Sequence, residues 1–400
     1  MKILIIAQRC PYPPNKGEKI RTFHHLRFFA ELGHEVILAS PYEDDSELIY
    51  FDTLKNLHCS QVLNAKVASK PIRLLSGALK NKALSVSNFY STKLQSQIDA
   101  QLQSQTIDVV FCSASSVAEY VFQSKVLANL DSPPKLIMDF MDVDSDKWTQ
   151  YQKSNPWPLS MVYGRESKLI TKFEASIVKK FDHCLLITQT EVNLFERLHG
   201  SVANLTAVEN GLDTSVFYPP DQPRTNKTPY FLFAGVMDYA PNIDAVMWFM
   251  DYVWPAIKKQ YPQAKFCIAG MNPTDKIKNL QDIEGIEVTG FVDDIKPYFD
   301  KTNIFVAPFR IARGVQNKIL QSFACGLPVI ATSMGAEGIR YKAEQDILLA
   351  DTPEQYIDKI KLLINNEERY LTLSNNALNT IDENYSWDSI LAPLTTLLKK

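Results

Sequence analysis

The chain has 400 residues, of which 46% are hydrophobic and 22% charged, and its formal net charge is −3. This length predicts two domains with ample hydrophobic core, and the composition is typical of a soluble globular protein. The small negative charge gives no support for nucleic-acid binding. The six Cys residues are scattered without a CxxC pair, which argues against a zinc site and against a disulfide framework.

The start of the sequence does not predict a signal peptide. Its apolar run, MKILIIA, is too short for a signal peptide and is followed at once by polar Gln8 and Arg9. No apolar run approaches the roughly 20 residues that a membrane-spanning helix needs. We therefore expect a cytoplasmic protein, with peripheral attachment to the inner face of the plasma membrane as the alternative.

The first half of the chain alternates short apolar runs with helical patterns. The runs predict buried strands at 2–7, 35–40, 108–112, 135–139 and 184–188. A Pro-rich loop and a helix at about 18–32 join the first two strands, which predicts a parallel crossover. Residues 1–205 are therefore predicted to form an α/β domain with a parallel sheet.

The second half repeats this alternation after a turn-rich segment that we interpret as a hinge. Its apolar runs predict strands at 230–235, 265–270, 285–289, 303–308 and 327–332. Helices are expected at about 242–260, 353–365, 367–384 and 387–399. Residues 206–385 are therefore predicted to form a second Rossmann-like domain.

One segment, 307–338, carries the strongest functional signal. Gly314 permits an unusual backbone conformation or a close ligand approach, and Asn317 is a good N-cap for a helix that Lys318 opens. Gly326 and Pro328 then end this helix. A helix N-terminus after a flexible loop favours an anion such as phosphate. An ordinary αβ unit of a doubly wound sheet would give the same pattern, so the sequence alone leaves both interpretations open.

This segment is similar to the donor-site signature of retaining nucleotide-sugar glycosyltransferases of family 4, which have the GT-B fold. Over nearly its whole length, the chain resembles the sugar transferases associated with PEP-CTERM/exosortase exopolysaccharide loci. The resemblance implies two Rossmann-like domains that face each other across a cleft. It also implies that a C-terminal helix, residues 386–400, packs back on the N-terminal domain.

The resemblance assigns donor-binding roles within this segment. Lys318 corresponds to the diphosphate ligand, Arg310 and Arg313 add positive charge, and backbone N–H groups near Gly314 complete the site. Neighbouring donor-side candidates follow in the same segment: Val315 and Asn317. A solvated lysine is the alternative for Lys318.

One position of this segment departs from the family pattern. Two Glu residues usually lie eight positions apart across the loop and helix. Here Arg313 at the first position resembles the PEP-CTERM-associated branch, whereas Gln321 at the second departs from the common Glu. A Gln oxygen still accepts a hydrogen bond from a ribose hydroxyl, but without charge assistance. The substitution therefore predicts weaker or altered donor binding.

Other donor-side candidates lie after strands of the second domain, where ligands bind in open parallel sheets. Gly235 follows the strand at 230–235, where Asn242 as an N-cap offers a structural explanation. The family's base-binding turn corresponds to Gly290, Phe291 and Val292. Glu337 lies in the GAEG loop, with a helix-start carboxylate as its alternative role.

In the first domain, the resemblance points to the loop after the first strand and to an acidic run. Gly17 would lie near donor and acceptor, and Arg9, Lys16 and Arg165 are acceptor-side candidates. The run at 138–148 is similar to the branch's acceptor-side motif and makes Asp139 and Asp142 candidates. It lacks the Gly and Glu of a calcium loop. Lys318, Arg313 and Asp139 are the catalytic candidates, and the resemblance implies neither metal nor cofactor.

Residues 53–98 contain seven Lys or Arg and no Asp or Glu. A solvated basic surface is one explanation, since long cationic side chains are common on protein surfaces. The apolar residues interleaved with these charges favour another, a surface that rests on anionic lipid and reaches a lipid-linked acceptor.

These observations predict a glycosyltransferase of the hexosyltransferase type. It would move a sugar from a nucleotide diphosphate donor to a glycan or lipid-linked acceptor with retention, in exopolysaccharide or cell-surface polysaccharide biosynthesis. The alternatives are a GT-B nucleotide- or glycan-binding protein with weak or no turnover, and a nucleotide-sugar epimerase. The absence of GxGxxG after any strand makes a dehydrogenase less favoured.

Overall fold

The computed structural model describes residues 1–15, 17–221, 224, 229–311 and 315–399. The chain divides into two compact units. Unit 1 comprises Met1–Asn210 and Ile390–Lys400, and unit 2 comprises Gly211–Ser389. The sequence analysis placed the corresponding boundaries after residues 205 and 385.

Within the described residues, unit 1 contains a seven-stranded sheet in the order β3-β2-β1-β4-β5-β6-β7, and every neighbouring pair is parallel. Its strands are β1 (Lys2–Ala7), β2 (Glu35–Tyr42), β3 (Gln61–Lys66), β4 (Val109–Ser113), β5 (Lys135–Met141), β6 (His183–Leu186) and β7 (Leu205–Ala207). The central strands β1 and β4 are buried nearly throughout, as expected for a parallel sheet with helices on both faces.

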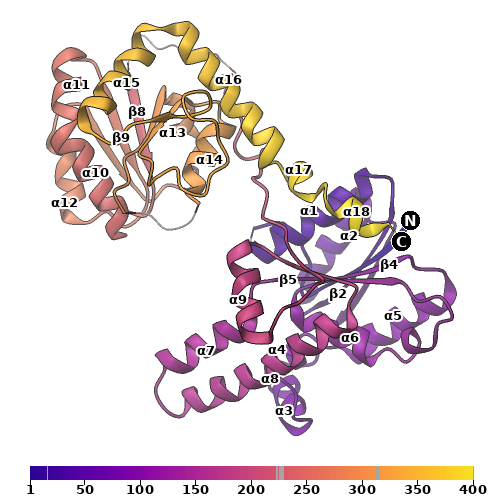
Figure 1. Cartoon of the computed structure of the whole chain (residues 1–400). Coiled ribbons are helices and arrows are strands. Elements are labelled where there is room, and N and C mark those ends of the chain that lie inside the picture. Colours follow the sequence, from indigo (N-terminus) through magenta and orange to yellow (C-terminus); the bar gives the residue numbers. More distant parts are fainter. Residues whose placement is uncertain (16, 222–223, 225–228, 312–314, 400) are drawn as a thin grey trace. The chain divides into compact units, whose positions relative to one another are not determined.

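The helices of unit 1 lie on both sides of this sheet, with α1, α2 and α18 on one side and α5, α6 and α8 on the other (Figure 1). Their bounds are α1 (Gly17–Glu31), α2 (Leu48–Leu57), α3 (Lys70–Leu79), α4 (Leu84–Asn88), α5 (Thr92–Ser104), α6 (Ala118–Gln123), α7 (Asp144–Ser154), α8 (Leu159–Lys180), α9 (Gln189–His199) and α18 (Leu394–Leu398).

The described part of unit 2 contains a six-stranded parallel sheet in the order β10-β9-β8-β11-β12-β13. Its strands are β8 (Tyr230–Ala234), β9 (Lys265–Ala269), β10 (Ile286–Gly290), β11 (Ile304–Ala307), β12 (Val329–Ala331) and β13 (Leu348–Leu349). Two parallel sheets, each flanked by helices, confirm the predicted α/β fold class with two Rossmann-like domains.

In unit 2, α10, α11, α12 and α15 cover one face of the sheet, and α13, α14 and α16 cover the other (Figure 1). The helices are α10 (Ala240–Tyr252), α11 (Trp254–Gln260), α12 (Asp275–Lys278), α13 (Lys296–Lys301), α14 (Asn317–Ala324), α15 (Pro353–Asn365), α16 (Glu367–Asn384) and α17 (Trp387–Leu391), the last of which crosses the boundary between the units.

Two predicted helices are interrupted in the structure. The helix expected at about 242–260 is divided at Val253 into α10 and α11, with Pro255 in the first turn of α11. The helix expected at 387–399 is divided into α17 and α18, and Pro393 is the N-cap of α18. Proline lacks a backbone N–H and therefore interrupts the ladder of a continuous helix.

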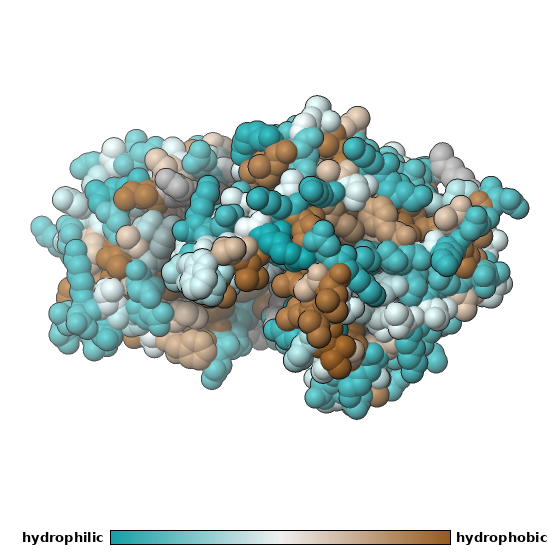
Figure 2. Space-filling view, turned by 90° about the horizontal axis from the view of Figure 1, so that it is seen from below, coloured by the Kyte–Doolittle hydropathy of each residue, from teal (hydrophilic) through white to brown (hydrophobic). Residues whose placement is uncertain are grey.

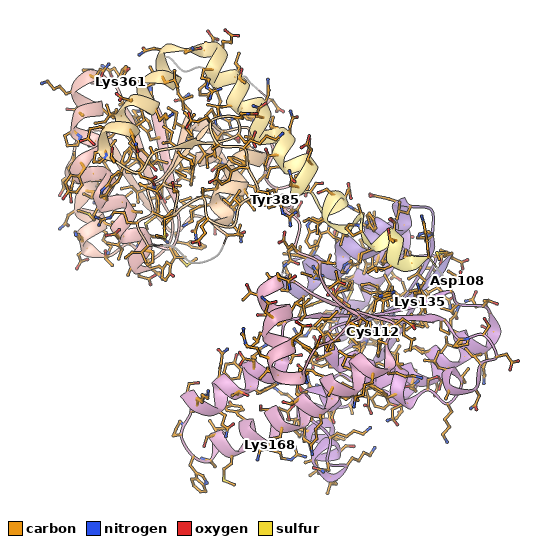
Figure 3. All side chains as sticks on the ribbon, in the orientation of Figure 1. Asp108, Cys112, Lys135, Lys168, Lys361 and Tyr385 are labelled. Carbon is orange, nitrogen blue, oxygen red and sulfur yellow. The ribbon has the colours of Figure 1, made fainter. Side chains whose placement is uncertain are left out.

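The C-terminal segment is fastened to unit 1 by Lys135, whose Nζ donates hydrogen bonds to the carbonyl oxygens of Leu397, at 2.9 Å, and Lys399. Figure 3 labels Lys135 near the ribbon of this segment, together with Cys112 within the sheet and Lys168 on the outward side of α8. All six cysteines are buried and free. Among the described residues, no helix is long and apolar enough to cross a membrane.

The connection between β9 and α12 depends on a glycine. Gly270 has φ +146°, and a Cβ built there would lie 1.7 Å from the carbonyl oxygen of Gly235. We predict that Gly270→Ala lowers the free energy of unfolding by about 2 kcal/mol or more, because the backbone of both loops must move. Thermal unfolding measures the effect, with Gly17→Ala as the control, since a Cβ at Gly17 meets no atom within 4 Å. Equal melting temperatures for the two variants would contradict the prediction.

Candidate functional site

Each sheet has one point at which the strand order reverses. It lies between β1 and β4 in unit 1 and between β8 and β11 in unit 2. The connections after these two strands leave toward opposite faces of the sheet, so a crevice forms at their carboxyl ends, where ligands bind in open α/β sheets. Gly235 and Lys318 lie at this point in unit 2, and Arg9 and Asp142 line a cavity at the corresponding point in unit 1.

In unit 2, Lys318 of α14 is half-buried beside the carboxyl ends of β8 and β11. Its Nζ lies 4.5 Å from the ring centroid of Phe309 and 5.2 Å from that of Phe233. Burial lowers the pKa of Lys318 to about 8. Among the described residues no carboxylate lies within ion-pair distance of this ammonium. A desolvated cation without an anionic partner is a group that an anionic ligand would stabilise.

Asn242 of α10 connects Lys318 to the loop after β8. Its Oδ1 accepts a hydrogen bond from Lys318 Nζ at 2.9 Å, and its Nδ2 donates to the carbonyl oxygen of Val236 at 2.8 Å. The sequence analysis treated Asn242 as an N-cap, which is wrong because the N-cap of α10 is Tyr239. Asn242 instead lies inside the first turn, buried, and fixes the position of the Lys318 ammonium.

Gly235 lies directly against this pair. A Cβ built on Gly235 would approach Asn242 Nδ2 to 2.7 Å and Lys318 Nζ to 3.2 Å. A side chain at position 235 would therefore displace the ammonium or the amide. The structure brings Gly235 and Lys318 together, which the sequence analysis had proposed separately for the same donor site.

The start of α14 differs in detail from the prediction. The N-cap is Gln316, without a side-chain capping bond, and Asn317 is the first helical residue and exposed. Gln321 lies one turn after Lys318, on the same side of the helix. Its side chain is half-buried and forms no hydrogen bond with another described residue. The amide of Gln321 therefore remains able to bond a ligand.

Arg310 is paired with an acidic residue in the structure. Its Nε donates to Asp244 Oδ2 at 3.0 Å, and a second guanidinium nitrogen bonds Asp244 Oδ1. This hydrogen-bonded ion pair raises the pKa of Arg310. Phosphate binding by Arg310 stays a prediction. A phosphate would have to compete with Asp244 for the guanidinium group. The other cationic and glycine candidates of this loop, Arg313 and Gly314, lie outside the described residues.

Three further donor-side candidates lie at the end of β10. Gly290 is the last residue of the strand, and Phe291 and Val292 begin the loop after it. Gly290 has φ +67° with open space around it, Phe291 is 67% exposed, and Val292 is half-buried. An exposed phenylalanine beside an open glycine backbone is a surface on which a planar ring can stack.

The GAEG loop packs against the segment that leads into α14. A Cβ built on Gly338, at φ +77°, would lie 3.3 Å from the side chain of Val315. Glu337 is exposed next to this contact, and Val315 is 43% exposed. The structure therefore brings the predicted residues Val315 and Glu337 to neighbouring loops.

Unit 1 contains a cavity of about 790 Å³ at its own switch point. Residues from the loops after β1, β4 and β5 and from helices α3, α4, α7 and α8 line it. Among the predicted residues, Arg9, Gly17 and Asp142 line the cavity. Arg9 also lies over the ring of Phe89 at 5.2 Å and forms an ion pair with Glu18.

Two predicted acceptor-side residues do not line the cavity in the structure. Arg165 of α8 instead donates to Asn81 Oδ1 and to the carbonyl oxygen of Lys82, both at 3.3 Å. Lys16 lies outside the described residues.

Beneath the cavity, Asp139 forms a fully buried ion pair with Arg21. Arg21 Nε donates to Asp139 Oδ2 at 2.7 Å, and a second guanidinium nitrogen donates to Oδ1 at 3.1 Å. Arg21 also bonds the backbone of Glu209 and the side chain of Asn210, each at 3.0 Å. Burial lowers the pKa of neighbouring His25 to about 3, so its ring is neutral. Because both carboxylate oxygens of Asp139 are engaged, the geometry supports a positioning role for it.

Asp144, at the start of α7, is the carboxyl group of the cavity with a perturbed proton affinity. Burial raises its pKa to about 6, although its Oδ2 accepts a hydrogen bond from Ser115 Oγ at 2.5 Å. Two neighbouring lining residues have left-handed backbones, Ala114 at φ 89° and Met141 at φ 68°. Strained backbone next to a desolvated carboxyl is typical of functional sites.

Several residues that line the cavity are not marked by any local sequence pattern. The side chain of Glu166 accepts two backbone hydrogen bonds and one from Ser85 Oγ at the start of α4, which orders that side of the cavity. Trp148 and Tyr163 also line the cavity, with ring centroids 5.6 Å apart. These residues come from segments that only the packing of α4, α7 and α8 brings together.

A metal centre is not formed by the side chains that the structure describes. In those ranges, no group of three or more His, Cys, Asp or Glu residues could hold an ion. The alternating Asp residues at 138–148 are dispersed: Asp139 is buried against Arg21, Asp142 is exposed, and Asp144 is bonded to Ser115.

Comparison with known proteins identifies the class of protein to which these sites belong. Residues 228–366 match the family model of Glycosyl transferases group 1. The matched segment lies within unit 2. Together with the two Rossmann-like sheets, it indicates a glycosyltransferase with the GT-B fold.

Three proteins are similar to the chain over nearly its whole length. A 44.6 kDa protein of the cps region of Klebsiella pneumoniae is 21% identical, and the alignment covers 98% of each chain. The structure of Anabaena HepE in complex with UDP has a TM-score of 0.55 at 13% identity, covering 100% of this chain and 99% of that one. A glycosyltransferase from Rickettsia africae has a TM-score of 0.57 at 14% identity, covering 100% and 97%.

The raised pKa of Asp144 gives a stability prediction. Its folded pKa exceeds the usual value near 3.8, so the ionised carboxyl destabilises the folded protein above pH 6, and this cost disappears below pH 4. We expect Asp144→Asn to stabilise the protein by about 1–2 kcal/mol at pH 7.5 and by much less at pH 4.5. Melting temperatures at both pH values test this, with exposed Asp142→Asn as the control. A pH-independent shift would contradict the assigned cause.

Proposed function

We propose that this glycosyltransferase moves a sugar from a nucleoside diphosphate sugar to a glycan or lipid-linked acceptor, with retention at the anomeric carbon. The proposed setting is exopolysaccharide or cell-surface polysaccharide biosynthesis on the cytoplasmic side of the membrane. The observation that carries the proposal is the half-buried Lys318 ammonium, held by Asn242 without a carboxylate partner among the described residues.

The diphosphate of the donor would occupy the anion site of unit 2. Lys318 would neutralise the negative charge that grows on the leaving diphosphate, and the N-terminal end of α14 would add unpaired N–H groups. A Cβ at Gly235 would lie 3.2 Å from Lys318 Nζ, so the absence of a side chain at this glycine leaves that side of the ammonium uncovered. The exposed ring of Phe291 and the backbone near Gly290 would contact the base.

The base is proposed to be uracil. HepE was solved in complex with UDP and also with UDP-glucose. A hexose donor of this kind agrees with a hexosyltransferase assignment, and the K. pneumoniae relative in a cps region supports a role in surface polysaccharide.

The acceptor would bind in the cavity of unit 1. A TarM structure from S. aureus contains fondaparinux, alpha-GlcNAc-glycerol and UDP, so a GT-B relative holds glycan ligands together with a nucleotide. Here Trp148 and Tyr163 would stack on a sugar ring, and Asp144 and Ser115 would bond its hydroxyl groups. Front-face transfer assisted by the leaving phosphate requires no protein nucleophile.

Donor selection is tested by a thermal-shift and turnover panel of UDP, GDP, ADP and CDP with their sugars. We expect UDP to raise the melting temperature, with the shift lost in Lys318→Ala. Gln321→Glu should tighten UDP binding about three- to tenfold, because a carboxylate accepts the ribose hydrogen bonds with charge assistance.

Three outcomes of this panel would overturn the proposal in different ways. No shift with any nucleotide would exclude a nucleotide donor. Sugar epimerisation without an acceptor would favour an epimerase. Turnover that arises only in Gln321→Glu would make the natural chain a binding protein.

The protonation of Lys318 gives a pH prediction for donor binding. Because its pKa is about 8, UDP affinity should fall as the pH rises through 8 to 9. In Lys318→Arg the cation stays charged, so any residual affinity should be flat over this range. Calorimetric titrations at four pH values measure it. An equal decline in wild type and Lys318→Arg would assign the pH effect to another group.

A further inference from the structure

Helix α3 of unit 1 has an apolar face that no described part of the chain covers. Ile72, Leu75 and Leu79 are 60%, 62% and 80% exposed, and their spacing places them along one side of the helix. Seen from below, Figure 2 shows a compact group of hydrophobic side chains over this part of unit 1. Contiguous exposed apolar surface of this kind marks a site of interaction.

The opposite face of α3 is firmly packed, so the exposed leucines belong to an ordered helix. Arg73 is buried and bonds Glu43 Oε1 at 2.7 Å and the carbonyl oxygen of Asn88. A Cβ built on Gly77 would come within 2.4 Å of Ser87 Oγ, which shows how closely α3 approaches α4.

Cations surround this apolar face. Lys70 and Lys80 flank the helix, and Lys93 begins the next long helix. None of the three forms an ion pair with another described residue. A second cavity, of about 610 Å³, borders α3, and five cationic side chains and Ile72 line it. Its one lining carboxylate, Glu119, is already paired with Lys82. The surface therefore combines apolar side chains with uncompensated positive charge.

A second apolar element lies on the other side of the acceptor cavity. Trp157, in the connection of α7 and α8, is 75% exposed, and Met161, in the first turn of α8, is 67% exposed. Leu74 of α3 and Val162 of α8 line the same cavity of about 790 Å³. The two apolar elements therefore flank one cavity within unit 1. Tryptophan and lysine beside aliphatic side chains are the residues that enter a membrane interface.

We propose that α3 docks on an anionic lipid bilayer, with Leu75 and Leu79 inserted among the acyl chains and the surrounding lysines on the headgroup phosphates. The α7–α8 connection contacts the same bilayer, so the cavity of unit 1 opens at the lipid surface. The inference that the acceptor is attached to a lipid rests on the proposed function. The docking itself requires no transfer reaction.

The test is sedimentation of the full chain with vesicles of phosphatidylcholine alone or mixed with phosphatidylglycerol. We expect binding to the anionic vesicles that weakens as salt rises. Leu75→Asn with Leu79→Asn should weaken it at least about tenfold, and each of Lys80→Gln and Lys93→Gln about fivefold. The matched control is Leu362→Asn with Leu371→Asn, which replaces two exposed leucines of unit 2 and should change nothing.

Each remaining outcome would overturn the proposal. It fails if wild type does not sediment with anionic vesicles, or if both leucine pairs behave alike. Equal binding to neutral and anionic vesicles would remove the role of the lysines. The UDP thermal shift, measured on the same variants, keeps this result separate from the proposed function, because Leu75 and Leu79 line neither cavity.

Discussion

The carboxyl ends of parallel strands meet at one edge of a sheet, and both candidate sites of this glycosyltransferase depend on that constraint. In each sheet the strand order reverses once, which separates two neighbouring loops and exposes backbone groups between them. Unit 2 places Gly235 and Lys318 at this point, and unit 1 places Arg9, Ala114 and Asp142 there. The two sheets share this arrangement of strands, but the loops after the strands carry different side chains. The chemistry of the two sites therefore differs.

Both sites hold an ionisable group where its charge is disfavoured. Burial lowers the pKa of Lys318 and raises that of Asp144, in opposite directions for the same physical reason. Such groups reduce the stability of the empty protein, whereas a ligand of suitable charge or hydrogen-bonding capacity relieves the cost. The buried Arg21–Asp139 pair shows the contrasting case, in which each charge is fully compensated inside the chain.

The two faces of α3 differ in the same way, because polar groups on one face have bonding partners within the chain and residues on the other face do not. Toward α4, Arg73 has its acidic and carbonyl partners. Toward solvent, Leu75 and Leu79 are exposed, and the flanking lysines form no ion pair with described residues. A lipid surface would supply both missing interactions at once. It would also bring a lipid-attached acceptor to the cavity that α3 and α8 flank.

The sequence by itself determined the fold class, because buried parallel strands are continuous apolar runs and the breaks between them contain Gly, Pro or Asn. It also predicted that Gly235 and Arg9 follow strands and that Lys318 lies at the start of a helix, because these are local features. Only the tertiary structure decided three contacts: Lys318 donates a hydrogen bond to Asn242, Arg310 pairs with Asp244, and Arg21 pairs with Asp139. These contacts join residues 66 to 118 positions apart. Local periodicity carries no information over such distances, because long-range contacts depend on how the helices pack against the sheet.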